Sequence, residues 1–212
     1  MKKDIIVYED DNIIVCNKPV GMPSQSDRTF EQDLVSYVLT HRTEQNEPAY
    51  AAIINRLDKP VGGLVLFAKN KKAAAGLSAV SGEHGIEKNY YALVKGSPCD
   101  KGEFTDYLLK DGKNNISTVT DKDTKGSKKA VLLYEKLGEK TIDGEKYSLM
   151  RVRLLTGRHH QIRVQFSHHG YPLYGDIKYN SDFRNRRDVS PALFAYHLSF
   201  KNPVGADRIT VE

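Results

Sequence analysis

The chain has 212 residues and a mass of 23.9 kDa, with 39% hydrophobic and 28% charged residues. This is the composition of a globular protein, and the length suits one large domain or two small ones. No apolar run approaches the roughly 18 residues of a membrane span, and the amino terminus does not resemble a signal peptide. Cys16 and Cys99 have no metal or redox spacing, so we expect free thiols in a cytoplasmic protein.

The formal net charge of +5 is modest support for a polyanionic partner. Basic residues gather in three places: Lys69, Lys71 and Lys72; Lys122, Lys125, Lys128 and Lys129; and Arg184, Arg186 and Arg187. Any one cluster is typical of a solvated surface. The three together favour a nucleic acid as the partner.

The first third of the chain predicts a hairpin followed by a loop and a helix. Residues 5–19 read as two β-rich runs about an Asp-Asp-Asn turn, with Pro19 ending the second strand. Residues 17–26 are rich in Pro, Gly and Ser, as loops are. Thr29 and Gln32 form a capping-box pattern that predicts a helix over residues 30–42, and residues 43–50 form a polar loop.

The following segments predict further strands and one short helix. Residues 63–69 and 88–96 have the apolar and β-branched content of strands. Between them, Asn70 is placed to cap a helix over residues 71–81. Residues 99–126 are rich in Lys, Asp, Gly, Asn and Thr, which predicts weak strands and a mobile insertion.

The last third contains the clearest hairpin. Residues 130–139 and 146–156 are strands joined at Asp143-Gly144. In residues 156–170, His159, Ile162, Arg163 and Phe166 recur at helical spacing, and Gly170 supplies a stop signal, so we expect a helix. The alternation of Ile162, Val164 and Phe166 is also compatible with a strand, which stays an alternative for this segment. Strands and hairpins dominate, which predicts an α+β fold around a mixed, largely antiparallel sheet with flanking helices.

Several kinds of site are excluded by missing motifs. The chain has no GxxxxGK[ST] or GxGxxG loop and no GxSxG elbow, so nucleotide-binding and serine-hydrolase readings lack support. The pairs His159-His160 and His168-His169 suggest a metalloenzyme as a rival hypothesis. Adjacent histidines diverge on a helix, however, and no HExxH pattern accompanies them.

The segment INRLDKPVGGLVLFAKN, residues 54–70, places a charged Arg-Leu-Asp against apolar sequence. Burying a carboxylate costs on the order of several kcal/mol in desolvation free energy unless the carboxylate is paired and hydrogen-bonded. Asp58 is therefore either a surface turn residue with an ordinary salt bridge or a carboxylate held in a cleft for a function.

Five segments occur in an order that resembles the successive motifs of the RluA-type pseudouridine synthases. They are NKPVGMPSQ, INRLDKPVGGLVLFAKN, KNYYALVKG, LLTGRHHQIRVQFSHHGYPLYGDIKY and FAYHLSFKNP. The resemblance covers residues 5–203. It implies one pseudouridine synthase catalytic domain over residues 1–212 with a central catalytic cleft, without the amino-terminal S4-type domain that the family often carries. It also implies isomerisation of uridine in rRNA or tRNA.

The resemblance implies roles for six residues. Asp58 matches the essential carboxylate, as a nucleophile or as a base at the ribose, and both roles stay open. Arg163 matches its ion-pair partner, and Tyr90 matches the tyrosine that packs against the target base. Arg56 matches the residue that fills the space left by the extruded nucleotide. Two further cations are placed along the phosphate path: Lys18 and Arg158.

We expect no cofactor and no metal, because the implied isomerisation is redox-neutral and the sequence offers no ligand set. We also expect a monomer that binds RNA and neither a membrane nor a nucleotide cofactor. The chain departs from the family pattern at Asn55, where the family has His, and at Val61-Gly62, where it has Thr-Ser. The late motif usually carries His where this chain has Phe194 and Asn202. These departures give the alternative of a catalytically altered RNA-binding protein on the same scaffold.

Overall fold

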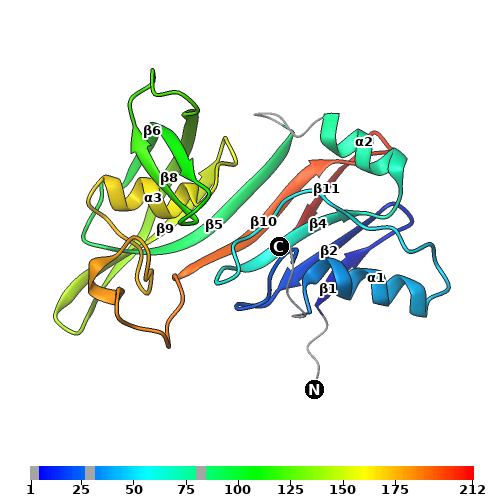
Figure 1. Cartoon of the computed structure of the whole chain (residues 1–212), viewed down its shortest axis with the longest axis horizontal. Coiled ribbons are helices and arrows are strands. Elements are labelled where there is room, and N and C mark those ends of the chain that lie inside the picture. The colour runs from blue at the N-terminus through cyan, green and yellow to red at the C-terminus, as the bar shows by residue number, and fades with distance from the viewer. Residues whose placement is uncertain (1–4, 27–31, 80–84) are drawn as a thin grey trace. The chain divides into compact units, whose positions relative to one another are not determined.

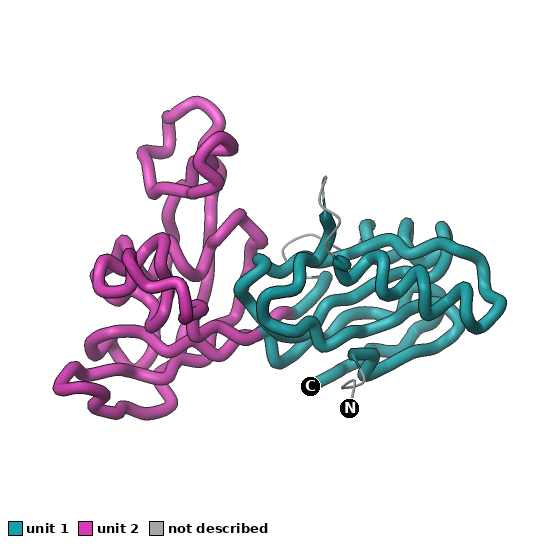
Figure 2. Tube along the Cα trace, turned by 60° about the horizontal axis from the view of Figure 1, so that its bottom comes forward, with its two compact units in different colours: residues 1–87, 195–212 teal, residues 88–194 magenta. Residues whose placement is uncertain are grey.

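A computed structural model describes residues 5–26, 32–79 and 85–212. The chain divides into two compact units, which Figure 2 colours separately. Unit 1 comprises residues 1–87 and 195–212, and unit 2 comprises residues 88–194. The predicted single catalytic domain over residues 1–212 stays a prediction.

Unit 1 is built on β-strands, and its β1–β2, β2–β4, β3–β4 and β10–β11 pairs are antiparallel (Figure 1). Its strands lie in the order β1 (Ile6–Glu9), β2 (Ile13–Lys18), β4 (Gly62–Ala68) and β10 (Leu193–Lys201), with β3 (Ala52–Ile53) beside β4 and β11 (Arg208–Val211) beside β10. The predicted opening hairpin is confirmed, and β2 ends directly before Pro19. Asp10 closes its turn, since one carboxylate oxygen accepts the backbone N–H groups of Asn12 and Ile13 at 2.7 and 2.8 Å.

Every residue of β4 is buried, so this strand is covered on both faces. The predicted helix after it is confirmed as α2 (Lys71–Ala79), and Asn70 caps it by accepting the Ala73 N–H at 2.8 Å. Residues 80 and 81, which the prediction included, lie outside the described residues. One face of the sheet packs against α2 in a single apolar cluster, whose buried members are Ile13, Val15, Leu64, Leu66, Ala68, Ala73, Leu77, Ile86, Leu198, Phe200 and Val211.

The first helix, α1 (Leu34–Glu44), starts later than the sequence indicated. Its N-cap is Asp33, whose carboxylate accepts the Ser36 N–H at 2.7 Å and the Ser26 N–H at 2.5 Å. An aspartate with extended backbone caps a helix as well as threonine does, so it displaced the predicted boundary. Thr29 itself lies outside the described residues.

Gly63 allows β4 to pass close to β10. Its φ is 120°, and a Cβ at this position would lie 2.2 Å from the carbonyl oxygen of Ala195. Only glycine fits such a contact and such a backbone angle without a shift of the strands.

The strands of unit 2 pair with one another in antiparallel fashion. Their order is β5 (Ile86–Lys95), β9 (Glu145–Leu154), β8 (Lys128–Ile142), β6 (Lys101–Asp111) and β7 (Ile116–Thr120). The β8–β9 hairpin turns at Asp143 and Gly144, with φ of 50° and 81°, as predicted. The prediction for residues 99–126 was wrong in one respect, because β6 is an 11-residue strand paired on both sides.

The predicted helix in residues 156–170 is confirmed as α3 (Gln161–His168), which excludes the strand alternative. It begins after His160, whose φ is 54°, so His159 precedes the helix. Gly170, with φ of 86°, follows its end. A short 3₁₀ helix, η1 (Ser181–Phe183), is the only other helical segment among the described residues of this unit.

One apolar cluster of unit 2 lies where α3 packs against β6 and β7. Leu108, Ala130 and Val164 are its buried members. Phe104 adds an edge-on contact to Phe166. Both units are therefore sheets with covering helices, which confirms the α+β fold. None of the helices in the described part of the chain could span a membrane.

Candidate active site

Asp58 lies in unit 1, in the loop that leads from β3 to β4. It opens a turn in which its carbonyl oxygen accepts the Val61 N–H at 3.0 Å. The side chain is half-buried, whereas Leu57 before it is buried and Arg56 is exposed. Leu57 thus anchors the Arg-Leu-Asp segment in the apolar interior, and the two charged residues reach solvent-accessible space.

Two polar side chains fix the backbone around this segment. The Ser24 hydroxyl donates to the Leu57 carbonyl at 2.7 Å and accepts the Leu57 N–H at 3.0 Å. The Asn55 amide accepts the Leu66 N–H at 2.8 Å and donates to the Leu64 carbonyl at 3.2 Å. Asn55, which departs from the family pattern, therefore ties the loop to β4 and leaves a well-held turn at Asp58.

Lys18 lies at the end of β2 with its side chain fully buried. Its ammonium donates to the carbonyl oxygens of Pro19, Met22 and Lys59 at 3.0, 2.7 and 3.2 Å. Lys59 directly follows Asp58, so Lys18 joins the two loops that bound the Arg-Leu-Asp segment. This placement favours support of the turn over contact with a phosphate, and the predicted place of Lys18 on the phosphate path stays a prediction.

Burial lowers the pKa of Lys18 to about 8, although the charge of Asp58 opposes this shift. A lysine with a lowered pKa in the folded state loses its proton before the unfolded chain does. Between pH 8 and 10.5 the unfolded state therefore binds more protons, and the free energy of unfolding rises with pH.

We expect this rise in the parent and not in Lys18→Met. Each pKa unit corresponds to about 1.4 kcal/mol. From pH 8 to 10 the free energy of unfolding of the parent should therefore rise by about 1–3 kcal/mol relative to that of the variant. Urea unfolding at the two pH values measures this difference in the free energy of unfolding. A difference that is the same at both pH values would mean that burial does not lower the pKa of Lys18.

Tyr90 lies on β5 in unit 2, where it pairs with Val152 of β9. Its side chain is 6% exposed and belongs to the buried face of the strand, which it shares with Lys88 and Ala92. Tyr91 is half-buried and points to the opposite face. The two tyrosines therefore lie on opposite faces of β5.

Arg163 lies on α3 and is 2% exposed. Its Nε and Nη2 donate to the two carboxylate oxygens of Asp176 at 2.7 and 2.8 Å. Asp176 is fully buried and also accepts the N–H groups of Lys178 and Tyr179. This bidentate pair was missed from the sequence, where the segment YGDIKY gave no separate signal for an arginine partner.

Tyr179 completes the setting of Arg163. The guanidinium carbon lies 5.2 Å from the centre of the Tyr179 ring, within cation–π range. The Tyr179 hydroxyl in turn lies 2.7 Å from the Ser117 N–H and 2.8 Å from His160 Nδ1. The guanidinium is thus fixed on one side by a carboxylate and on another by an aromatic ring.

Arg158 lies in the loop before α3. Its N–H donates to the side-chain oxygen of Gln161 at 2.9 Å, and its Nε donates to the Lys129 carbonyl at 2.8 Å. Arg158 precedes the helix, whereas Arg163 lies within it. The guanidinium is at the surface and Arg163 is not, so the two arginines have separate environments.

The histidine pairs have ordinary partners. His159 lies 2.9 Å from the Ser117 hydroxyl and 3.0 Å from the Asn115 side-chain oxygen. His169 Nε2 lies 3.1 Å from the Asp106 carboxylate. Among the residues that the structure describes, no group of three or more His, Cys, Asp or Glu side chains could hold a metal ion.

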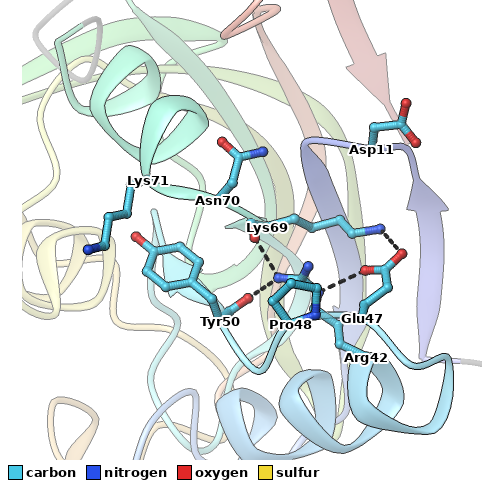
Figure 3. Close-up of a pocket in the computed structure, with 8 residues that line it drawn as sticks. All are labelled: Asp11, Arg42, Glu47, Pro48, Tyr50, Lys69, Asn70 and Lys71. Carbon is cyan, nitrogen blue, oxygen red and sulfur yellow. Dashed lines mark hydrogen bonds and ion pairs between the residues drawn. The ribbon is translucent and has the colours of Figure 1, made fainter.

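A separate open pocket of about 550 Å³ lies in unit 1 (Figure 3). The buried Arg42 pairs there with Glu47 at 2.9 Å, and Lys69 pairs with Glu47 at 3.0 Å and with Glu9 at 2.8 Å. Lys69 was grouped with the basic clusters, but its charge is neutralised and its side chain is buried. The pocket therefore does not present two unpaired cations to an anion.

The sequence of the chain matches the model of a known family over residues 12–168, and the description of that family is RNA pseudouridylate synthase. The chain belongs to the RNA pseudouridylate synthase family. It is 32% identical over 221 residues to the tRNA pseudouridine synthase C of Haemophilus ducreyi, covering 97% of this chain and 88% of that protein. It is also 32% identical to the ribosomal large subunit pseudouridine synthase D of Zymomonas mobilis, covering 96% and 67%.

The fold agrees with this family. The human RNA pseudouridylate synthase domain containing 1 superposes with a TM-score of 0.81 at 21% identity, covering all of this chain and 84% of that one. As a pseudouridine synthase, the protein is an isomerase that converts uridine in RNA to pseudouridine. The alternative of a non-catalytic RNA-binding protein finds no support in these relatives.

Proposed function

We propose that Asp58 is the essential carboxylate of this pseudouridine synthase and that Tyr90 and Arg163 complete its catalytic set. The observation that carries the proposal is the held turn at Asp58, with a buried leucine, a serine clamp and a buried lysine around it. A surface turn has no need of such anchoring. A carboxylate that must meet one ribose or one base in a fixed geometry does.

Arg163 suits the role of a partner to that carboxylate. A guanidinium has several N–H donors in a rigid fork, and Asp176 engages only two of its nitrogen atoms. A fork of this kind is able to bind two carboxylates at once. Asp176 also keeps Arg163 charged and oriented before any substrate arrives, so we assign Asp176 as a positioning residue.

The substrate that we propose is a uridine in a folded rRNA or tRNA. The names of two relatives support both classes of RNA, since one is a tRNA pseudouridine synthase and the other a ribosomal large subunit pseudouridine synthase. We further propose that both units form one catalytic domain and act as a monomer. The exposed Arg56 is then available to occupy the space that the target nucleotide leaves.

Formation of pseudouridine releases the proton on C5 of the target uracil, which gives a direct assay. Purified protein is incubated with tRNA and rRNA transcripts that carry tritium at C5 of uridine, and released tritium is counted. We expect release from at least one transcript with the parent. An inactive parent that binds every transcript normally would contradict the proposal.

We also expect no dependence on metal ions, because the isomerisation is redox-neutral and no ligand set was found in the described residues. Dialysis against a strong chelator should leave the rate of tritium release unchanged. The control is a sample dialysed without chelator, tested on an RNA whose fold is verified in both buffers. A loss of rate that zinc restores would revive the histidine hypothesis.

A further inference from the structure

The ammonium group of the half-buried Lys88 differs in its surroundings from the buried cations of this protein. Lys18 has three carbonyl partners, Lys69 has two carboxylates and Arg163 has Asp176. The Lys88 ammonium makes no hydrogen bond or ion pair with any residue that the structure describes, although the side chain is half-buried. Burial lowers the pKa of Lys88, and no carboxylate among the described residues opposes the shift.

Lys88 faces a loop whose position is fixed. Its Nζ lies 3.6 Å from the point where a Cβ on Gly157 would stand, and no other atom lies within 4 Å of that point. The neighbouring Thr156 hydroxyl accepts the Val131 N–H at 2.8 Å and donates to Gln161 at 2.8 Å. The loop is therefore tied to β8, and the missing side chain of Gly157 leaves open space beside the ammonium.

Lys88 and Tyr90 lie on the same face of β5, because side chains two residues apart share a face of a strand. The separation of such residues along a strand is about 7 Å, close to the distance between a base and a phosphate of one nucleotide. A cation that has lost water and has no protein anion gains more from an incoming anion than a solvated or paired lysine does.

We propose that Lys88 and the Gly157 loop form a binding site for an anionic oxygen of the substrate RNA, at the target nucleotide or its neighbour. The inference rests on the proposed packing of Tyr90 against the target base. Two sources can supply the oxygen. One is a backbone phosphate, and the other is a uracil oxygen that gains charge when the N1–C1′ bond breaks.

The test compares Lys88→Met, Lys88→Arg and Lys95→Met. Lys95 is the matched control, since it lies on the same strand but pairs with Glu145 and Asp182. Affinity for labelled tRNA and rRNA transcripts is measured at several salt concentrations, together with single-turnover rates and melting temperatures. If the source is a phosphate, Lys88→Met should bind about tenfold more weakly and lose about 0.7–0.9 from the salt slope.

If the source is the uracil oxygen, Lys88→Met should keep its affinity and lose at least about tenfold in single-turnover rate. In both cases Lys88→Arg should recover most of the loss, and the melting temperature of Lys88→Met should stay equal or rise, since an unpaired buried charge is removed. Lys95→Met should show neither loss.

Gly157→Ala supplies a test that leaves the charge in place. The added methyl group would occupy the open space beside the ammonium, so it should reproduce the defect of Lys88→Met without lowering the melting temperature. The inference is overturned if Lys88→Met keeps both affinity and rate, or if its only defect is a lower melting temperature. The parent remains an active pseudouridine synthase in those cases, so this failure is distinct from failure of the proposed function.

Discussion

Replacing Asp58 by Asn is expected to lower the rate of pseudouridine formation by about 10³-fold or more while RNA affinity stays within about threefold of the parent. An amide has nearly the shape of a carboxylate but cannot act as a nucleophile or a base at the ribose. Removing a negative charge does not weaken binding to a polyanion. The turn should survive, because Ser24, Asn55 and Lys18 hold it through backbone atoms.

Single-turnover tritium release and RNA-binding titrations measure the two effects separately. Asp207→Asn is the control, because Asp207 is exposed in the same unit and its loss changes the net charge equally. A variant that retains a tenth of the parent rate would show that Asp58 is not the catalytic carboxylate. Equal loss of affinity and rate would instead assign Asp58 to binding.

Arg163→Met is expected to damage both stability and catalysis. The variant leaves Asp176 fully buried without its ion-pair partner, which costs about 3–5 kcal/mol in the free energy of unfolding. It also removes the proposed partner of Asp58. Urea unfolding measures the first effect, and single-turnover rates at a temperature where the variant is folded measure the second.

A second variant separates these two effects. Adding Asp176→Asn to Arg163→Met removes the stranded charge and keeps an oxygen for the N–H groups of Lys178 and Tyr179. The double variant should regain at least about half of the free energy of unfolding that Arg163→Met loses, and the catalytic defect should remain. Recovery of the rate in the double variant would mean that Arg163 serves only to neutralise Asp176.

Arg158→Met is the matched control for the same segment. Arg158 is exposed and has a carbonyl partner in place of a carboxylate, so its loss should cost little stability. It should weaken RNA binding and reduce the salt slope by about one. If Arg158→Met costs stability and catalysis while Arg163→Met changes only the salt slope, the two assignments are reversed.

The regular elements could be predicted where the local pattern is strong. The opening hairpin, the capped helix after Asn70 and the Asp143-Gly144 hairpin all follow from turn and capping chemistry within a few residues. The predictions failed where two local signals competed. Asp33 capped α1 in place of the Thr29 pattern, and the polar residues of β6 concealed a strand that its neighbours pair on both sides.

The partners of the candidate site were harder to predict, because they depend on contacts far apart in the sequence. No local pattern around Lys18 predicted that three carbonyl groups, one of them 41 residues away, would surround its ammonium. Asp176 lies 13 residues from Arg163 and gave no motif of its own. The order of the motifs identified the candidate residues of the site. The hydrogen bonds and ion pairs that hold them could be identified only from the three-dimensional structure.

The most direct test of the account maps pseudouridine in total tRNA and rRNA from cells that lack this gene, restored with the parent or with Asp58→Asn. The account predicts that one or a few pseudouridines disappear without the gene, return with the parent and stay absent with the variant expressed at equal level. Identical maps in all strains would contradict the assigned reaction. Restoration by the Asp58→Asn variant would contradict the central role of its carboxylate.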